Sequence, residues 1–274
     1  MILRDEKIVT TIIKYINSKK DIKRYFDFSY KSQKHKIYDQ LVEIIKVIKV
    51  IKYGTPWRTI DKIPWNTVYS TYKRLLKLNI IKETYKELLK QYYKKTPNRK
   101  LKIQITDTTC VKNRYGSDFV KYNGYKKMKC TKVSFITDIN GIPISVLVSN
   151  GTKCDSRVLL EQLMYNFIID NNLNDKNKNI ILADSLYDCK DVIDKLVSLG
   201  YTPIIAINKR NTKFKKIRKL TQKEKEKYKK RIYIEHTNNK FKNHRRCICR
   251  YDRFIEAFYG SIYISLIDSV LNVL

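Results

Sequence analysis

The sequence has 274 residues, which is long enough for two domains of ordinary size with a buried core. It carries 58 Lys and Arg against 26 Asp and Glu, a formal net charge of +32, and its 43% of hydrophobic residues excludes a disordered basic tail. We expect such a protein to bind a polyanion, most often nucleic acid. A membrane surface is the weaker alternative, because the charge is not confined to one amphipathic helix. AT-rich codons also favour Lys, so the functional argument depends on position.

We do not expect a membrane-spanning protein, a secreted protein or a small domain stabilised by disulfide bonds. The longest uncharged stretch, 139–152, is short of the roughly 18 apolar residues of a spanning helix and is interrupted by Gly141 and Pro143. The opening MILRDEKIVT is charged from its fourth residue, unlike a signal peptide. The six cysteines contain no C-x-x-C pair, so we expect reduced thiols and no zinc site. The expected location is the cytoplasm at the nucleoid, or the nucleus of a eukaryotic host, without a membrane partner.

Residues 1–97 are predicted to form a helical domain, and a polar segment with a proline separates it from a second domain, 98–274. Apolar residues three and four positions apart predict helices at 37–53, 65–78 and 82–94. The tryptophans Trp57 and Trp65 flank the break between the first two helices. This arrangement could be a helix-turn-helix-like unit that reads DNA ends, or a helical bundle in which both tryptophans anchor the core.

The second domain changes from a helical period to a period of two. Strands are predicted at 101–107, 133–137, 142–148, 180–183 and 203–207, and helices at 158–169, 188–199, 228–245 and 252–274. The turn Asn140-Gly141 joins two of the strands into a hairpin. This order matches an RNase H-like α/β fold, a mixed sheet flanked by helices.

Two aspartates stand at the ends of apolar strands. Asp107 follows LKIQIT and Asp184 follows IILA. A carboxylate beside a buried apolar run is costly unless it is paired or binds a cation. The alternative is that each aspartate ends its strand by capping the next turn or helix.

A glutamate belongs to a second pattern. The residues Tyr228, Arg231, Glu235 and Lys242 are spaced so that, on a continuous helix, they fall within roughly 60° of one another. The alternative is a solvated charged face, with Glu224 and Glu226 as other candidate acids. Oxygen ligands of this kind suit Mg²⁺ or Mn²⁺, and two such ions can support in-line displacement at phosphorus.

The whole ordered set resembles the DDE transposases of the insertion-sequence-five group, over about residues 37–274. The family signature Y-x2-R-x3-E-x6-K is met at every position, QITDTT matches the segment of the first acid, and ILADSLYD matches that of the second, with Tyr187 at the place of a common family tyrosine. Gly124-Tyr125-Lys126-Lys127 stands where the family usually has G-R-K-R. The N-terminal match is looser, because three extra residues, 61–63, precede Pro64.

The resemblance implies a transposase that cuts the ends of its own element and joins the freed 3′-hydroxyls to target DNA. It implies that Asp107, Asp184 and Glu235 bind two Mg²⁺ or Mn²⁺ ions. The candidate DNA-contacting residues are Tyr228, Arg231, Lys242, Lys126, Lys127, Arg58 and Arg74. The implied partners are double-stranded DNA, as terminal inverted repeats and as target, and a second copy of the chain. Three rivals stay open: a decayed transposase that only binds DNA, an RNase H-like nuclease without strand transfer, and a basic RNA-binding module.

Overall fold

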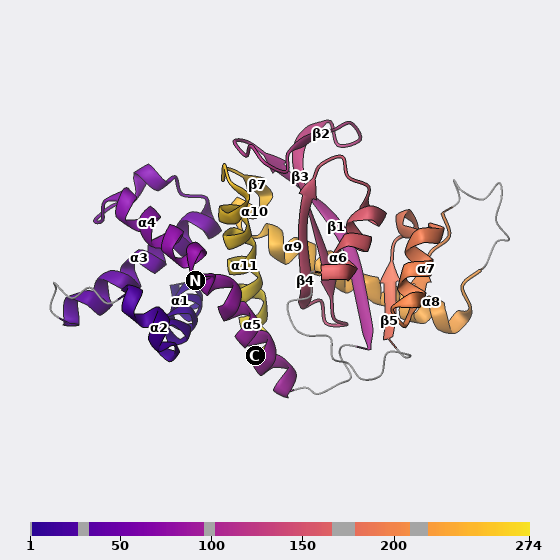
Figure 1. The fold of residues 1–274 in the computed structure, drawn as a ribbon, viewed down its shortest axis with the longest axis horizontal. Helices are drawn as coiled ribbons and strands as arrows, with labels where there is room; N and C mark the ends of the chain where they lie inside the picture. The colour runs from indigo at the N-terminus through magenta and orange to yellow at the C-terminus, as the bar shows by residue number, and fades with distance from the viewer. Residues whose placement is uncertain (1, 27–32, 96–101, 166–178, 209–218) are drawn as a thin grey trace. The chain divides into compact units, whose positions relative to one another are not determined.

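The computed structural model describes residues 2–26, 33–95, 102–165, 179–208 and 219–274 (Figure 1). They form two compact units. The first contains Met1–Tyr92, Arg114–Ser117 and Lys240–Leu274, and the second contains Tyr93–Asn113 and Asp118–Asn239. The predicted boundary at residue 97 lies outside the described residues, and the C-terminal helices group with the N-terminal ones.

The first unit is helical. Its elements are α1 (Ile2–Ser18), α2 (Lys20–Lys23), the 3-10 helix η1 (Arg24–Phe26), α3 (Gln33–Tyr53), the 3-10 helix η2 (Trp57–Thr59), α4 (Trp65–Lys77), α5 (Ile80–Lys95), α10 (Arg245–Ile248), the two-residue strand β7 (Cys249–Arg250) and α11 (Ile255–Leu271). The predicted helices of the N-terminal region are thus present, within a few residues of their expected ends. No helix of the described segments is long and apolar enough to cross a membrane.

The apolar helix α11 packs at the centre of this unit, because almost every side chain from Phe258 to Val270 is buried. Its contact with α4 depends on Gly260, since a Cβ there would meet the Tyr72 hydroxyl at 2.5 Å. Tyr72 donates a hydrogen bond to the Ala257 carbonyl. A charged group is also buried here: the Lys52 ammonium lies 2.7 Å from a carboxylate oxygen of Asp5.

The two predicted tryptophan anchors differ in their surroundings. The Trp57 ring packs against Tyr69 and Tyr72, at centroid distances of 5.2 and 5.5 Å. Trp65 is 40% exposed. Trp57 is thus half-buried against an aromatic pair and not part of the buried core, and the core-anchor interpretation is wrong for the exposed Trp65. Eleven residues, 54–64, separate α3 from α4, where a helix-turn-helix motif uses a turn of about three or four. Its DNA-reading role stays a prediction.

The second unit is built on a mixed sheet. Its strands are β1 (Ile103–Asn113), β2 (Lys121–Asn123), β3 (Met128–Thr137), β4 (Pro143–Asn150), β5 (Asn179–Ala183) and β6 (Tyr201–Ile205). The strands pair in the order β4-β3-β1-β5-β6, with β2 also on β3. β3 is antiparallel to β1 and β4, whereas β1, β5 and β6 are parallel. This order and the helices around it confirm the predicted RNase H-like mixed sheet.

Helices lie on both faces of this sheet. They are α6 (Asp155–Tyr165), the 3-10 helix η4 (Ser185–Tyr187), α7 (Lys190–Ser198), α8 (Gln222–Tyr228), the 3-10 helix η6 (Lys229–Arg231) and α9 (Ile232–Lys242). Figure 1 shows α6 in front of the sheet and α9 behind it. One face buries a core of Ile136, Ile144, Leu159, Ile181 and Tyr187.

Several predicted elements are revised. The strands expected at 101–107 and 133–137 are longer, Ile103–Asn113 and Met128–Thr137, and β2 was not predicted. The single helix expected at 228–245 is divided, because a 3-10 turn at Lys229–Arg231 joins α8 to α9, and α9 ends at Lys242. The helix expected from residue 252 begins at Ile255, after Phe254 in extended conformation. The end of the helix predicted at 158–169 and part of the basic stretch after residue 209 lie outside the described residues.

Candidate active site

Asp107 and Asp184 stand at equivalent positions of neighbouring parallel strands. The pairs Ile103–Ile180 and Ile105–Leu182 are each 77 residues apart, and so are the two aspartates. Side chains two residues apart on a strand point to the same face, and Asp184 keeps an extended backbone although β5 has ended. Both carboxylates therefore belong to the same face of the sheet, at the carboxyl end of β5.

α9 covers this face beside Asp107. The Asn238 amide of α9 donates a hydrogen bond of 2.8 Å to the Asp107 carboxylate. The next residue back, Thr237, donates to the Gly141 carbonyl in the β3–β4 turn at 2.6 Å. These two contacts fix α9 against the strand that carries the first acid.

Burial raises the pKa of the Asp107 carboxyl above its ordinary value. Three interactions lower this pKa, but by less than burial raises it: the hydrogen bond from the Thr108 backbone N–H, the positive charge of Arg231 and the Asn238 hydrogen bond. An ionised carboxylate whose desolvation is incompletely compensated is a group that gains from a nearby cation.

Asp184 makes the contact expected of a strand-ending cap, because its carboxylate accepts a hydrogen bond from the backbone N–H of Ser185 at the start of η4. A capping carboxylate is not thereby excluded as a ligand, since one oxygen of a carboxylate can accept while the other coordinates.

Glu235 lies in the first turn of α9 and is exposed. It is three residues before Asn238, hence on the same side of the helix. Among the described residues, no three His, Cys, Asp or Glu side chains form a group that could hold a metal ion. The structure thus brings Asp107 and Asp184 to one face and does not gather Glu235 with them.

The predicted DNA-contacting residues fall into two groups. Tyr228 and Arg231 lie one turn apart in the second unit: the guanidinium is 5.4 Å from the ring centroid and donates to the Tyr228 hydroxyl at 3.2 Å. Lys126 and Lys127, also in the second unit, are exposed in the β2–β3 turn.

The other three belong to the first unit. Lys242 is half-buried in the last turn of α9, Arg58 lies 5.8 Å from the Trp65 ring, and Arg74 lies 5.5 Å from the Phe26 ring. These arginines therefore stack on aromatic rings.

The structure adds Asn238, Asp155 and Lys132 to the functional candidates, and it places Tyr187, which the family resemblance had marked. Asn238 lies one turn beyond Glu235, so the helical period that selected Glu235 also pointed to it. The buried Tyr187 contacts the Thr108 hydroxyl at 3.0 Å, and burial, with Asp107 and Asp155 nearby, raises its pKa well above the ordinary value. Asp155 in turn pairs with Lys132 at 2.7 Å. No motif marks this last pair.

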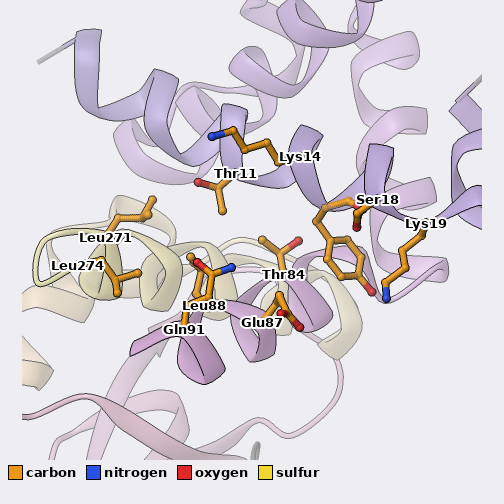
Figure 2. A pocket seen from close by; sticks show the side chains of 11 residues that line it. Thr11, Lys14, Ser18, Lys19, Thr84, Glu87, Leu88, Gln91, Leu271 and Leu274 are labelled. Carbon is orange, nitrogen blue, oxygen red and sulfur yellow. The ribbon is translucent and has the colours of Figure 1, made fainter. Parts of the chain in front are cut away.

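A cavity of about 550 Å³ lies elsewhere, within the first unit between α1, α5 and the end of α11 (Figure 2). Figure 2 shows Lys14, Lys19 and Glu87 among the side chains around it. None of the predicted acids lines this cavity, so it is not the candidate active site.

The transposase DDE domain family matches residues 98–267, more than half of the chain, and the chain therefore belongs to this family. Two solved structures are similar in part. One is a Mos1 transposase paired-end complex with left transposon end, 15% identical over 64% of this chain and 54% of that chain, with a TM-score of 0.25. The other is a pre-cleavage Mos1 transpososome, 12% identical over 81% and 74%, with a TM-score of 0.28. The chain spans about half the length of the first. A comparison with curated proteins found no match.

Proposed function

We propose that this chain is an active transposase of the insertion-sequence-five group, which cuts the ends of its own element and joins the 3′-hydroxyls to target DNA. The observation that supports the proposal is the strand register, by which Asp107 and Asp184 belong to one face of the sheet, with the Asn238 amide of α9 bonded to Asp107. Membership of the transposase DDE domain family supports it.

In this proposal Asp107, Asp184 and Glu235 hold two Mg²⁺ or Mn²⁺ ions. The incompletely compensated charge of Asp107 and its position opposite Asp184 support the first two assignments. The Y-R-E-K spacing and the place of Glu235 one turn from Asn238 support the third. Such ions lower the pKa of a bound water and neutralise charge on a phosphoryl group.

Tyr228, Arg231 and Lys242 would hold phosphates of the element end. The stacking of Arg231 on Tyr228 supports a fixed orientation for that guanidinium, which can bind phosphate through two parallel N–H groups. Lys126 and Lys127 add exposed charge on the second unit, and Arg58 and Arg74 add charge on the helical unit, which we assign to the inverted repeats. A homodimer would pair two element ends.

The test is a cleavage and joining assay with linear DNA that carries the sequences flanking this reading frame. Wild-type protein with Mg²⁺ should produce end-cut DNA and products joined to a target plasmid. Glu235→Gln should bind the ends and cut nothing. The matched control is Glu256→Gln, which changes another exposed glutamate in the first turn of a helix, α11, and should leave cutting intact.

Each rival gives a different result. A decayed transposase binds the ends without cutting, an RNase H-like nuclease cuts without joined product, and an RNA-binding module is indifferent to all three acids. Any of these results would overturn the proposal.

A further inference from the structure

A surface of the first unit joins two segments that are far apart in the sequence. Residues Arg114–Ser117 follow β1 directly and lie against the segment after β7. The Arg114 N–H donates to the Arg250 carbonyl at 2.9 Å, and the Ser117 N–H donates to the Arg253 carbonyl at 3.1 Å. These backbone bonds fix both segments as one surface.

A buried arginine supports this surface from below. Arg250 is fully buried, and its guanidinium donates to the carbonyls of Asp252 and Arg253 at 3.0 and 3.1 Å. It also lies 5.4 Å from the Phe258 ring of α11. Because the loop is tied to the core in this way, its exposed side chains are presented by an ordered backbone, which lowers the entropic cost of binding.

The side chains on this surface are aromatic rings paired with arginines. We call it the aromatic–arginine surface, and it consists of the exposed residues Arg114, Tyr115, Tyr251, Arg253 and Phe254, with Arg246 buried next to Tyr251. Each ring has an arginine guanidinium near it, at 5.8 Å for Tyr115, 5.1 Å for Tyr251 and 5.6 Å for Phe254. The Tyr115 and Tyr251 centroids are 5.9 Å apart.

The rings are exposed although they are large and apolar. Tyr115 is 63%, Tyr251 45% and Phe254 57% exposed. Clustered exposed aromatics of this size mark an interaction site. Asp252 is half-buried and lies near Arg246 and Arg250, whereas Arg114 and Arg253 are exposed and give the outer face positive charge.

We propose that the aromatic–arginine surface binds single-stranded DNA by stacking unpaired bases on Tyr115, Tyr251 and Phe254 while the arginines contact the phosphates. Aromatic faces accept any base, and arginine adds charge and cation–π attraction. Paired bases in duplex DNA do not present their faces, so the unpaired strand is the favoured occupant. This activity goes beyond end cutting and needs no divalent ion.

Binding to two fluorescent strands tests the proposal in EDTA. One strand is an oligodeoxythymidine of roughly 12 nucleotides, a length within the usual site size of such surfaces. The other has the same number of phosphates and no bases. Wild-type protein should prefer the strand with bases. Stacking is worth about 1–3 kcal/mol per base and the variant loses two rings, so Tyr115→Ala with Tyr251→Ala should weaken oligodeoxythymidine binding by at least about thirtyfold and remove the preference.

Matched variants separate stacking from charge and from folding. Tyr115→Phe with Tyr251→Phe keeps both rings and should bind like wild type. The control Tyr25→Ala removes another exposed tyrosine with an arginine 5.1 Å from its ring, and it should have no effect on the preference. Equal wild-type affinity for the two strands would overturn the proposal, as would a double alanine variant that keeps the preference or changes only the oligomeric state.

Discussion

The Asn238 amide in α9 and the Asp107 carboxylate in β1 form a hydrogen bond of 2.8 Å between residues 131 positions apart in the chain. This bond attaches the helix that carries Glu235 to the strand that carries the first acid. The position of Glu235, the proposed third acid, therefore depends on Asn238, which is not itself an acid.

Asp107→Asn is expected to stabilise the folded protein in the absence of divalent ions. Burial raises the pKa of Asp107 above its unfolded value, so ionisation costs more in the folded state. The folded state loses stability as the pH rises through this range, and Asn removes the loss. Urea unfolding in EDTA should show the variant more stable at neutral pH, with the difference shrinking as the pH falls toward ~3.9, the ordinary pKa of aspartate.

Adding Mg²⁺ should make the wild-type protein more stable than Asp107→Asn. A ligand that binds only the folded state at about 100 times its Kd adds about 2.7 kcal/mol to the free energy of unfolding. Wild-type protein should gain stability with Mg²⁺ and Asp107→Asn should not. Equal gains in both proteins would contradict Asp107 as a metal ligand.

Gly141→Ala should destabilise the second unit and slow cleavage. Gly141 has a φ of +76°, and a Cβ there would meet the Thr237 hydroxyl at 2.6 Å and the Tyr233 carbonyl at 2.8 Å. We expect a loss of about 1–3 kcal/mol, since the left-handed backbone and the contact with α9 are both strained.

The control for this change is Gly124→Ala, because a Cβ at Gly124 meets no atom within 4 Å. Urea unfolding should separate the two variants. A Gly141→Ala protein as stable as Gly124→Ala would show that the β3–β4 turn does not fix α9.

The sheet was predictable because its strands carry strong local signals. IILA is apolar on both faces, and Asn140-Gly141 specifies a tight turn; both elements appear where expected. Asp107 and Asp184 were found for the same reason, since each follows a run of largely apolar strand residues, although β1 continues past Asp107 to Asn113. Their common face follows from strand register, which depends on pairing between distant segments.

The environment of the third acid was less predictable. The 3-10 turn at Lys229–Arg231 tightens the helix between Tyr228 and Glu235, and no residue in this basic segment marks it, because Lys and Arg favour ordinary helix. The pairing of Asn238 with Asp107 is a tertiary contact. The aromatic–arginine surface likewise required two segments more than a hundred residues apart to meet.

The cysteines should differ in reactivity. Cys154 is exposed, and a hydrogen bond from Ser156 lowers its pKa. Burial, with Cys110 nearby, raises the pKa of Cys130 to about 12. Because the thiolate is the nucleophile, iodoacetamide should modify Cys154 first in the folded protein, as peptide mass mapping would show. Modification of Cys130 at an equal rate would contradict this packing.

DNA binding should depend strongly on salt. If the surface neutralises about 6 to 10 phosphates, affinity should fall by roughly 10³ to 10⁵ between 50 and 200 mM salt. Fluorescence anisotropy with a duplex end fragment measures the slope. A flat response would mean that the charge of +32 reflects codon usage and not a DNA-binding surface.

Two substitutions of Arg231 separate the effect of its positive charge from the effect of its planar guanidinium group. Burial raises the pKa of Asp107, and the positive charge of Arg231 partly opposes this rise. Arg231→Gln removes the charge, so the pKa of Asp107 should rise further and the acid limb of the cleavage pH profile should move to higher pH.

Arg231→Lys keeps the charge and loses the planar group stacked on Tyr228. It should leave the acid limb in place and weaken binding to the element end, because an ammonium does not replace a two-pronged phosphate contact. Identical pH profiles for Arg231→Gln and wild type would show that the guanidinium does not act on Asp107.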